Sequence, residues 1–304
     1  MIKVAVVGVG NLGSCVAYEI ANRGLVDRLI LIDVYRELAE GNADDITQAL
    51  AFRNETEVLA GDYEDAKGSH AIIVTAGKPR TPEMRSRMDL LEVNKKIIED
   101  VASNIRKMGE SPIIVTLTNP VDVMNYLMQK TTGIDRRKVI GSAGMLDSSR
   151  FKVVLSQRLR TSIMDIEAYV IGEHGDYQVP LFSQVRIKGK KRSFNKNEQN
   201  EIMSEIRQAA LKVISKKGAT IFAPANNTAN IVEMILRDEK KMAVCSVILR
   251  GEYGVDDVSI GVPVILGCEG VERILEYELD EDEKEMFTKG AQYLKRTIKE
   301  ILKE

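Results

Sequence analysis

The sequence has few of the residues that mark disulfide-rich, metal-binding or membrane-spanning proteins. It contains no tryptophan, two histidines and three cysteines in 304 residues. Cys15, Cys245 and Cys268 are far apart and form no paired or metal-ligand spacing, so we expect free thiols and no metal site. No apolar run approaches the roughly 18 residues that span a bilayer. The basic, apolar and small-residue succession of a signal peptide does not follow Met1, which favours a cytoplasmic protein.

An excess of charge of either sign is also missing. Lys and Arg number 43 and Asp and Glu number 45, which leaves a formal net charge of -2. Nucleic acid or an anionic membrane surface is therefore not an expected partner. Hydrophobic residues make up 44% of the chain, so a large core or two domains that share an interface can form.

The first half of the chain alternates short apolar runs with amphipathic segments. Four runs rich in Val, Ile and Leu cover residues 2–7, 29–32, 71–75 and 113–117. Continuous apolar runs of this length are typical of strands that are covered on both faces. Between the first two, Leu12, Val16 and Ile20 recur at helical spacing. The repeated order of strand, helix and strand predicts a Rossmann-type, doubly wound parallel sheet.

The pattern changes near residue 142, so we expect a dinucleotide-binding domain over residues 1–142 and an α+β substrate and catalytic domain over residues 143–304. The second half predicts helices over 148–159 and 196–217, an extended run over 166–171, an antiparallel strand pair over 242–249 and 258–266, and a terminal helix. Pro224 lies in a further helical stretch, where we expect a kink.

A glycine motif, G-x-G-x-x-G, follows the first predicted strand directly and opens the first predicted helix. Gly8 allows a tight turn, Gly10 lets the backbone approach a pyrophosphate, and Gly13 lets the helix lie close to the strand. The amides near Asn11 and Leu12 belong to the helix N-terminus, which attracts phosphate. The motif and its placement predict dinucleotide binding.

Asp33 ends the second apolar run, twenty residues beyond Gly13. A carboxylate at this position accepts hydrogen bonds from the ribose hydroxyls of NAD and repels the 2′-phosphate of NADP. The sequence therefore favours NAD, although nearby Arg36 leaves NADP open as a weaker second cofactor.

A catalytic histidine is the most direct sign of chemistry. His174 lies between two glycines in the segment 171–176, whereas His70 begins an apolar strand and is expected to be structural. Histidine changes charge near neutral pH, as proton transfer coupled to hydride transfer requires. Asp147 and Arg150, three residues apart, suit one orienting carboxylate and one clamp for a substrate carboxylate. From these residues alone, an N-capping Asp with a surface ion pair stays open as the alternative.

With these residues in place, the chain resembles the lactate/malate dehydrogenase family along its whole length, in particular the lactate dehydrogenase-like malate dehydrogenases. The matching segments are residues 8–13, 33, 75–77, 79–94, 118–122, 146–151, 172–176 and 218–220. The resemblance implies that His174 exchanges a proton, that Asp147 orients it and that Arg150 binds the substrate's C1 carboxylate. It further implies that the cofactor is bound by Thr75, Ala76, Gly77, Asn94 and Asn119, and the substrate by Asn119 and Thr220.

The family's mobile lid corresponds to residues 77–91. Arg87 falls where the family keeps the arginine that polarises the reacting carbonyl, and Arg80 falls where malate enzymes carry Arg and lactate enzymes usually carry Gln. The chain departs from the family here, with seven residue steps between these arginines where the family usually has six. Arg85 is therefore a competing anchor for the second substrate carboxylate.

The resemblance implies an NAD-dependent dehydrogenase that converts (S)-malate and oxaloacetate. The lid spacing keeps an L-lactate or broad 2-hydroxy acid dehydrogenase open. A non-catalytic NAD-binding redox sensor is the alternative from another class, but binding alone needs neither His174 nor Asp147, Arg150 or Arg87. Similar enzymes of this branch are usually tetrameric, so we expect a homotetramer, with a dimer as the alternative.

Overall fold

The computed structural model describes residues 1–78 and 87–303, with side chains described in residues 1–78 and 90–303. The α-helices of these ranges are α1 Asn11–Asn22, α2 Arg36–Leu50, α3 Arg87–Lys107, α4 Val121–Thr132, α5 Gly144–Leu159, α6 Lys196–Lys217, α7 Phe222–Leu236 and α8 Glu281–Leu302. The strands are β1 Lys3–Val7, β2 Arg28–Ile32, β3 Glu57–Ala60, β4 Ala71–Val74, β5 Ile113–Thr116, β6 Val139–Gly141, β7 Ile166–Glu167, β8 Val170–Gly172, β9 Gln178–Pro180, β10 Arg186–Ile187, β11 Lys190–Lys191, β12 Lys241–Arg250, β13 Asp256–Gly267 and β14 Gly270–Ile274.

The first six strands form a parallel sheet in the order β3-β2-β1-β4-β5-β6. The apolar residues of β1, β2, β4 and β5 are almost all buried, because helices cover both faces of the sheet. The chain first runs outward from β1 to β3 and then crosses to β4 on the other side of β1. The carboxyl ends of β1 and β4 therefore meet at a switch point, which is where open sheets of this order bind ligands. The predicted doubly wound fold is confirmed.

The second half of the chain extends the same sheet. Gly141 of β6 pairs with Ser246 of β12, and β12 pairs antiparallel with β13 along almost its whole length. The path then continues from β13 to β8 and β9, while β14 pairs with the other part of β13. The predicted antiparallel pair is confirmed, and the hydrogen-bonded sheet passes from one half of the chain into the other.

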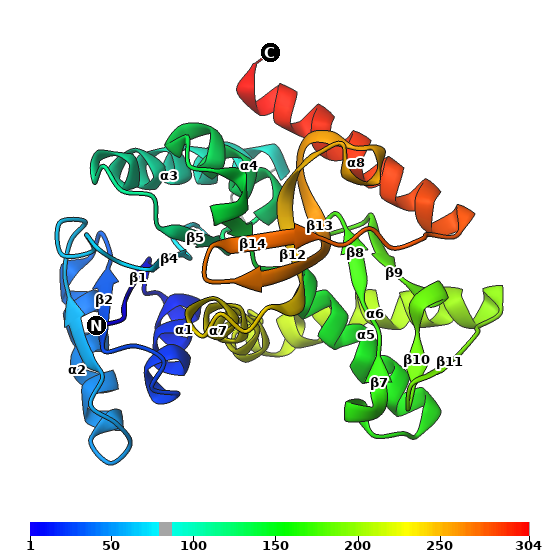
Figure 1. Cartoon of the computed structure of the whole chain (residues 1–304), viewed down its shortest axis with the longest axis horizontal. Coiled ribbons are helices and arrows are strands. Elements are labelled where there is room, and N and C mark those ends of the chain that lie inside the picture. The colour runs from blue at the N-terminus through cyan, green and yellow to red at the C-terminus, as the bar shows by residue number, and fades with distance from the viewer. Residues whose placement is uncertain (79–86, 304) are drawn as a thin grey trace.

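Helices of both halves pack across this sheet. Figure 1 shows α3 and α4 on one side of the strands and α1 beside α7 on the other. Arg23 at the end of α1 donates to the side-chain oxygens of Asn226 and Asn230 on α7, at 2.5 and 2.6 Å. A smaller second core lies where α5 and α6 meet and is centred on buried Phe151 and Ile206. Contacts between the halves thus include polar side chains as well as the shared sheet.

Two local expectations were wrong. The extended run over 166–171 splits into β7 and β8, and β7 joins the separate three-stranded sheet with β10 and β11. Pro224 is the third residue of α7, whose N-cap is Ile221, rather than an interior residue. The first turn of a helix does not use its N–H groups for intrahelical bonds, so proline fits there without the predicted kink.

Candidate active site

The glycine motif forms the turn between β1 and α1. Gly8 has φ of +87°, which favours glycine, and a Cβ there would lie 2.5 Å from the backbone nitrogen of Ala76. A Cβ at Gly13 would overlap the carbonyl oxygen of Gly8, so α1 can lie against β1 only with glycine at this position. Glycine is therefore required at both positions, because β1, α1 and the segment after β4 approach one another closely here.

Gly10 differs because the space beside it is open. It is the exposed N-cap of α1, and a Cβ built on it would meet no described heavy atom within 4 Å. No side chain of the described residues caps this helix end, so amides near Asn11 and Leu12 keep their hydrogen-bonding capacity. Free amides, a positive dipole end and open space fit the pyrophosphate of a dinucleotide.

Asp33 follows β2 at the same edge of the sheet. Its two carboxylate oxygens accept the backbone N–H groups of Val9 at 2.8 Å and Tyr35 at 3.0 Å. Each oxygen keeps a further lone pair, so the carboxylate can still accept the ribose hydroxyls of a nucleotide. Asn42 donates to the Val9 carbonyl oxygen at 3.1 Å, a support for this turn that no sequence signal indicated. Arg36 is exposed and its Nε donates to Glu40 at 2.9 Å.

The segment after β4 closes the turn from the other side. Thr75 Oγ1 donates to the Gly8 carbonyl oxygen, and the Ala76 amide donates to the Val7 oxygen at 3.0 Å. Thr118 Oγ1, after β5, donates to the Ala76 oxygen at 2.7 Å. The backbone from Thr75 to Gly77 is therefore held between the glycine turn and the chain that leads to Asn119.

Asn94 lies on α3 and is only 1% exposed. Its side-chain oxygen accepts the Lys78 amide at 2.8 Å, and its Nδ2 donates to the Asn119 oxygen at 2.8 Å. The amide thus spans two backbone segments that end at the carboxyl edge of the sheet. Asn119 itself is an exposed residue. In this geometry Asn94 holds the backbone of Asn119, whereas the family resemblance implies that both residues bind the cofactor.

His174 lies in the turn after β8 and contacts Asp147 of α5. Its Nδ1 is 2.6 Å from Asp147 Oδ2, while Arg150 Nη1 donates to Asp147 Oδ1 at 3.0 Å. Asp147 is 5% exposed and Ala143 is the N-cap of α5, so the alternative of a capping Asp with a surface ion pair is wrong. The structure brings the imidazole of His174 against a carboxylate 27 positions earlier in the sequence and places the Arg150 guanidinium on the same carboxylate.

The environment of His174 favours its charged form. Burial alone would lower the pKa of the imidazole, but the Asp147 carboxylate raises it to about 9, with a further contribution from the charge of Asp122 and a smaller opposing one from Arg150. Because Asp147 occupies Nδ1, Nε2 points to the other side of the ring. The arrangement can give a proton from Nε2 or take one there.

Asp122 is a functional candidate to which sequence reasoning gave no role. It lies in the first turn of α4, is 3% exposed, and accepts the His174 backbone N–H at 2.8 Å. Its other oxygen accepts the Ser246 hydroxyl at 2.5 Å. Burial raises the pKa of this carboxyl to about 7. Because Asp122 is three residues from Asn119, the His174 turn is fastened beside the carboxyl end of β5.

Of the three lid arginines named from the sequence, the described residues include only the backbone of Arg87. Arg80 and Arg85 lie outside the described residues, and Arg87 is the first residue of α3 with a side chain outside the described set. Thr220 is half-buried just before α7, and its Oγ1 is buried without a hydrogen-bond partner among the described residues. His70 lies before β4, at the amino edge of the sheet, where its Nδ1 accepts the Lys3 amide at 3.3 Å.

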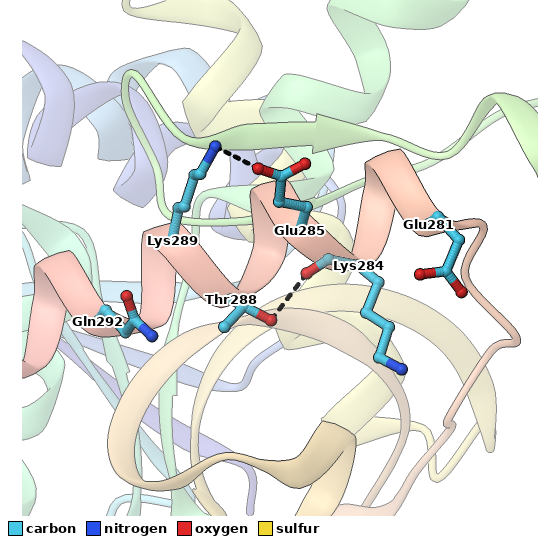
Figure 2. A pocket seen from close by; sticks show the side chains of 6 residues that line it. All are labelled: Glu281, Lys284, Glu285, Thr288, Lys289 and Gln292. Carbon is cyan, nitrogen blue, oxygen red and sulfur yellow. Dashed lines mark hydrogen bonds and ion pairs between the residues drawn. The ribbon is translucent and has the colours of Figure 1, made fainter.

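The hollow along α8 is lined by none of the side chains of this cluster. The hollow in Figure 2 runs along α8, where Lys289 pairs with Glu285 at 2.6 Å within the helix, so it is a solvated helix face. Among the described side chains, no group of three or more His, Cys, Asp and Glu residues is arranged to hold a metal ion. Within the described ranges, no helix combines the length and apolar character needed to cross a membrane.

Comparison with known families assigns both halves of the chain. Residues 2–141 match the NAD binding domain of lactate/malate dehydrogenase, and residues 144–304 match its alpha/beta C-terminal domain. A malate dehydrogenase of Halobacterium salinarum is 41% identical over 99% of this chain and 100% of the relative.

Solved structures agree with this assignment. A minor L-lactate dehydrogenase of Enterococcus mundtii has a TM-score of 0.94 at 31% identity and covers 98% of this chain and 97% of that chain. The malate dehydrogenase of Cryptosporidium parvum also has a TM-score of 0.94, at 32% identity, covering 100% of this chain and 99% of that chain. Because both halves match the family and full-length relatives share about 40% of their residues with it, the chain belongs to the lactate/malate dehydrogenase family.

Proposed function

We propose that this protein is an NAD-dependent malate dehydrogenase, which transfers hydride reversibly between (S)-malate and oxaloacetate. The contact of His174 Nδ1 with Asp147 Oδ2 at 2.6 Å carries the proposal, because a proton-transfer imidazole needs a partner that orients it and stabilises its charged form. The 41% identical relative named malate dehydrogenase supports malate and oxaloacetate as the substrate pair.

His174 provides the proton that accompanies hydride transfer. In the reductive direction its imidazolium gives the Nε2 proton to the carbonyl oxygen of the keto acid. In the oxidative direction the neutral ring takes the hydroxyl proton of malate. Asp147 holds the ring by Nδ1 and stabilises the imidazolium in both directions. Bound NAD supplies the hydride acceptor for oxidation and, when reduced, the donor for reduction.

The arginines act on the charges of the substrate. Arg150, held at 3.0 Å by Asp147, binds the C1 carboxylate, and Arg87 draws charge onto the reacting carbonyl oxygen. Arg80 or Arg85 binds the second carboxylate, while Asn119 and Thr220 line the pocket. Positioned proton transfer contributes about 10² to 10⁴-fold, so these orienting charges must supply much of the remaining acceleration.

The cofactor is held at the switch point of the sheet. The amides of Asn11 and Leu12 bind the pyrophosphate beside Gly10, and Thr75, Ala76 and Gly77 line the opposite wall. Asp33 accepts both ribose hydroxyls of the adenosine, which selects NAD over NADP. Since Arg36 is exposed and already paired with Glu40, it offers NADP at most a weaker second site.

The decisive experiment is a paired measurement of kcat/KM for oxaloacetate and pyruvate with NADH, repeated with NADPH. We expect oxaloacetate to be preferred by more than tenfold and NADH over NADPH by a similar factor. A preference for pyruvate would favour a lactate or broad 2-hydroxy acid dehydrogenase. Tight NADH binding with no turnover of any keto acid would favour the redox sensor instead.

We further propose a division at residue 142 into a cofactor-binding and a catalytic domain, a homotetrameric assembly and a cytoplasmic location. The tetramer follows the usual assembly of the family branch that the sequence resembles. Multi-angle light scattering at several protein concentrations distinguishes it from a dimer. Fractionation of the source cells, with oxaloacetate-dependent NADH oxidation as the readout, tests the location.

A further inference from the structure

A buried carboxylate lies on the backbone side of the proposed catalytic histidine. Asp122 accepts the His174 amide at 2.8 Å through Oδ2 and the Ser246 hydroxyl at 2.5 Å through Oδ1. Both carboxylate oxygens therefore accept hydrogen bonds from residues of the second half of the chain. A surface-capping role is excluded, because the side chain is 3% exposed.

The hydrogen bonds continue from Asp122 into the core. Ser246 Oγ lies 2.9 Å from Ser259 Oγ, and Asn125 Nδ2 donates to Ser259 Oγ at 3.0 Å. The hydrogen-bonded groups come from three elements: Asp122 and Asn125 from α4, Ser246 from β12 and Ser259 from β13. This network therefore links the backbone of His174 to one helix and two strands. The hydroxyls of Ser246 and Ser259 are both partnered in this network, whereas Asn125 Oδ1 is buried without a hydrogen-bond partner among the described residues.

The charged groups around Asp122 and His174 come from three segments. Asp147 and Arg150 approach from α5, Glu173 from the His174 turn itself, and Asp122 from α4. Glu173 is 2% exposed and its Oε2 accepts the Tyr177 amide at 3.0 Å, while its charge raises the pKa of Asp122. Arg150 opposes the imidazolium, whereas Asp147 and Asp122 both favour it.

We propose that Asp122 is a second positioning carboxylate of His174, which fixes the backbone of the histidine and stabilises its imidazolium by charge, while the Ser246 hydroxyl favours the ionised form of Asp122. The inference rests on the proposed function, since it takes His174 as the proton-transfer group. Asp147 thus contacts the imidazole ring directly at Nδ1. Asp122 instead accepts a hydrogen bond from the backbone amide of His174 and stabilises the imidazolium by longer-range electrostatic attraction.

This arrangement couples two protonation events. Asp122, with a pKa of about 7, gains its negative charge as the pH rises through neutrality. His174, with a pKa of about 9, is still protonated there and is stabilised by the new charge. Removing the charge of Asp122 should therefore make the imidazolium easier to deprotonate.

The chain offers a clean measurement because it has two histidines in all. Histidine-selective labelling gives one imidazole signal for His174 and one for His70, and His70 serves as the internal reference. We expect Asp122→Asn to lower the pKa of His174 by about half a unit to one unit, the lower end of the effect of a neighbouring opposite charge. The titration of His70 should stay unchanged.

A graded series sharpens the test. Ser246→Ala removes the hydroxyl that favours ionised Asp122, so it should move the His174 titration in the same direction by less. Asp135→Asn is the matched control, since Asp135 caps a 3₁₀ turn at Arg136–Lys138 away from this network. If Asp122→Asn is folded, as judged by circular dichroism, and His174 titrates as in the wild type, the proposal is overturned.

A second test uses the unmodified protein, so a folding defect of a variant cannot affect its result. The His174 amide donates to Asp122, so its ¹⁵N–¹H signal should shift in two steps, near pH 7 with the carboxyl and near pH 9 with the ring. If the carboxyl ¹³C signal of Asp122 shows that it stays protonated until the ring has lost its proton, the proposal is overturned.

Kinetics distinguish this inference from the proposed function. The ascending limb of malate oxidation should move to lower pH in Asp122→Asn by the same amount as the His174 titration. A purely structural role would lower kcat and leave the limb in place, which would overturn the inference. Absence of malate turnover in the wild type would contradict the proposed function, whereas the histidine titrations would still decide the role of Asp122.

Discussion

The two halves of the site are built in different ways. The proposed cofactor turn uses six consecutive residues, and its proposed phosphate-binding groups are backbone amides beside the open space at Gly10. The catalytic cluster uses side chains from α4, α5 and the turn after β8, whose residues are 25 and 27 positions apart. Local sequence therefore determines the first region, whereas the second depends on tertiary packing, and mutations should separate the two.

The largest effect is expected at His174, since it should affect catalysis without affecting the cofactor turn. His174→Asn removes the proton-transfer group and should lower kcat by about 10² to 10⁴-fold. NADH affinity, measured by fluorescence titration, should stay within about threefold, because the turn at Gly8 does not depend on this ring. A parallel loss of NADH binding would mean that the two regions are not separable.

Gly13→Ala should have the opposite pattern. Its Cβ would overlap the Gly8 carbonyl oxygen, so we expect NADH binding to be lost and the free energy of unfolding to fall by about 1 to 3 kcal/mol. Gly41→Ala is the matched control, because a Cβ there meets no described heavy atom within 4 Å and the residue lies inside α2. Urea denaturation should show the control unchanged or slightly stabilised. Equal loss in both variants would contradict the steric explanation.

The pH dependence tests the catalytic region by itself. Malate oxidation needs neutral His174, so kcat/KM should rise about tenfold for each pH unit below the pKa of about 9 and then level off. Oxaloacetate reduction needs the imidazolium and should fall over the same range. A profile that levels off below pH 7 would contradict the stabilising role of Asp147.

The same titration has a consequence for stability. A histidine whose pKa is raised from 6.5 to about 9 on folding stabilises the protein fully below pH 6.5, and this contribution disappears as the pH rises through 9. Asp147→Asn should therefore reduce the melting temperature more at pH 6 than at pH 10. An equal reduction at both pH values would assign the loss to packing instead of charge.

The smallest effect is expected at Asp33, where the turn keeps its backbone but loses its selective group. Asp33→Ser should weaken NADH binding by roughly tenfold and weaken NADPH binding much less, because the like charge that opposes a 2′-phosphate is removed. Comparing KM for the two cofactors checks this. The imidazole titration of His174 should not change, and a shift there would show unexpected coupling between the regions.

Much of the fold could be predicted from local pattern. The apolar runs before Gly8, Asp33 and Thr75 are the strands β1, β2 and β4, because a strand covered on both faces needs continuous apolar residues. The run over 166–171 was harder. Periodicity indicates an extended chain but does not say which strand it pairs with, and β7 and β8 pair in different sheets.

The site shows the same limit in its supporting residues. Asp122 and Asn94 both lie in segments that match the family, yet their contacts with His174 and with Asn119 could not be read from the chain. An aspartate in a first helical turn resembles an ordinary helix-start residue. Only its burial against the turn after β8 makes Asp122 a partner of the histidine.

The sequence by itself determined the strands β1, β2 and β4, the glycine turn and the position of Asp33 after β2. These features are local, because apolar runs and backbone turns depend on residues that are neighbours in the chain. The tertiary structure decided that Asp147, Asp122 and His174 meet, and hence that the imidazole is held in its charged form. The strength of a charge interaction depends on distance and burial, and neither is defined until β6 pairs with β12 and joins the two halves.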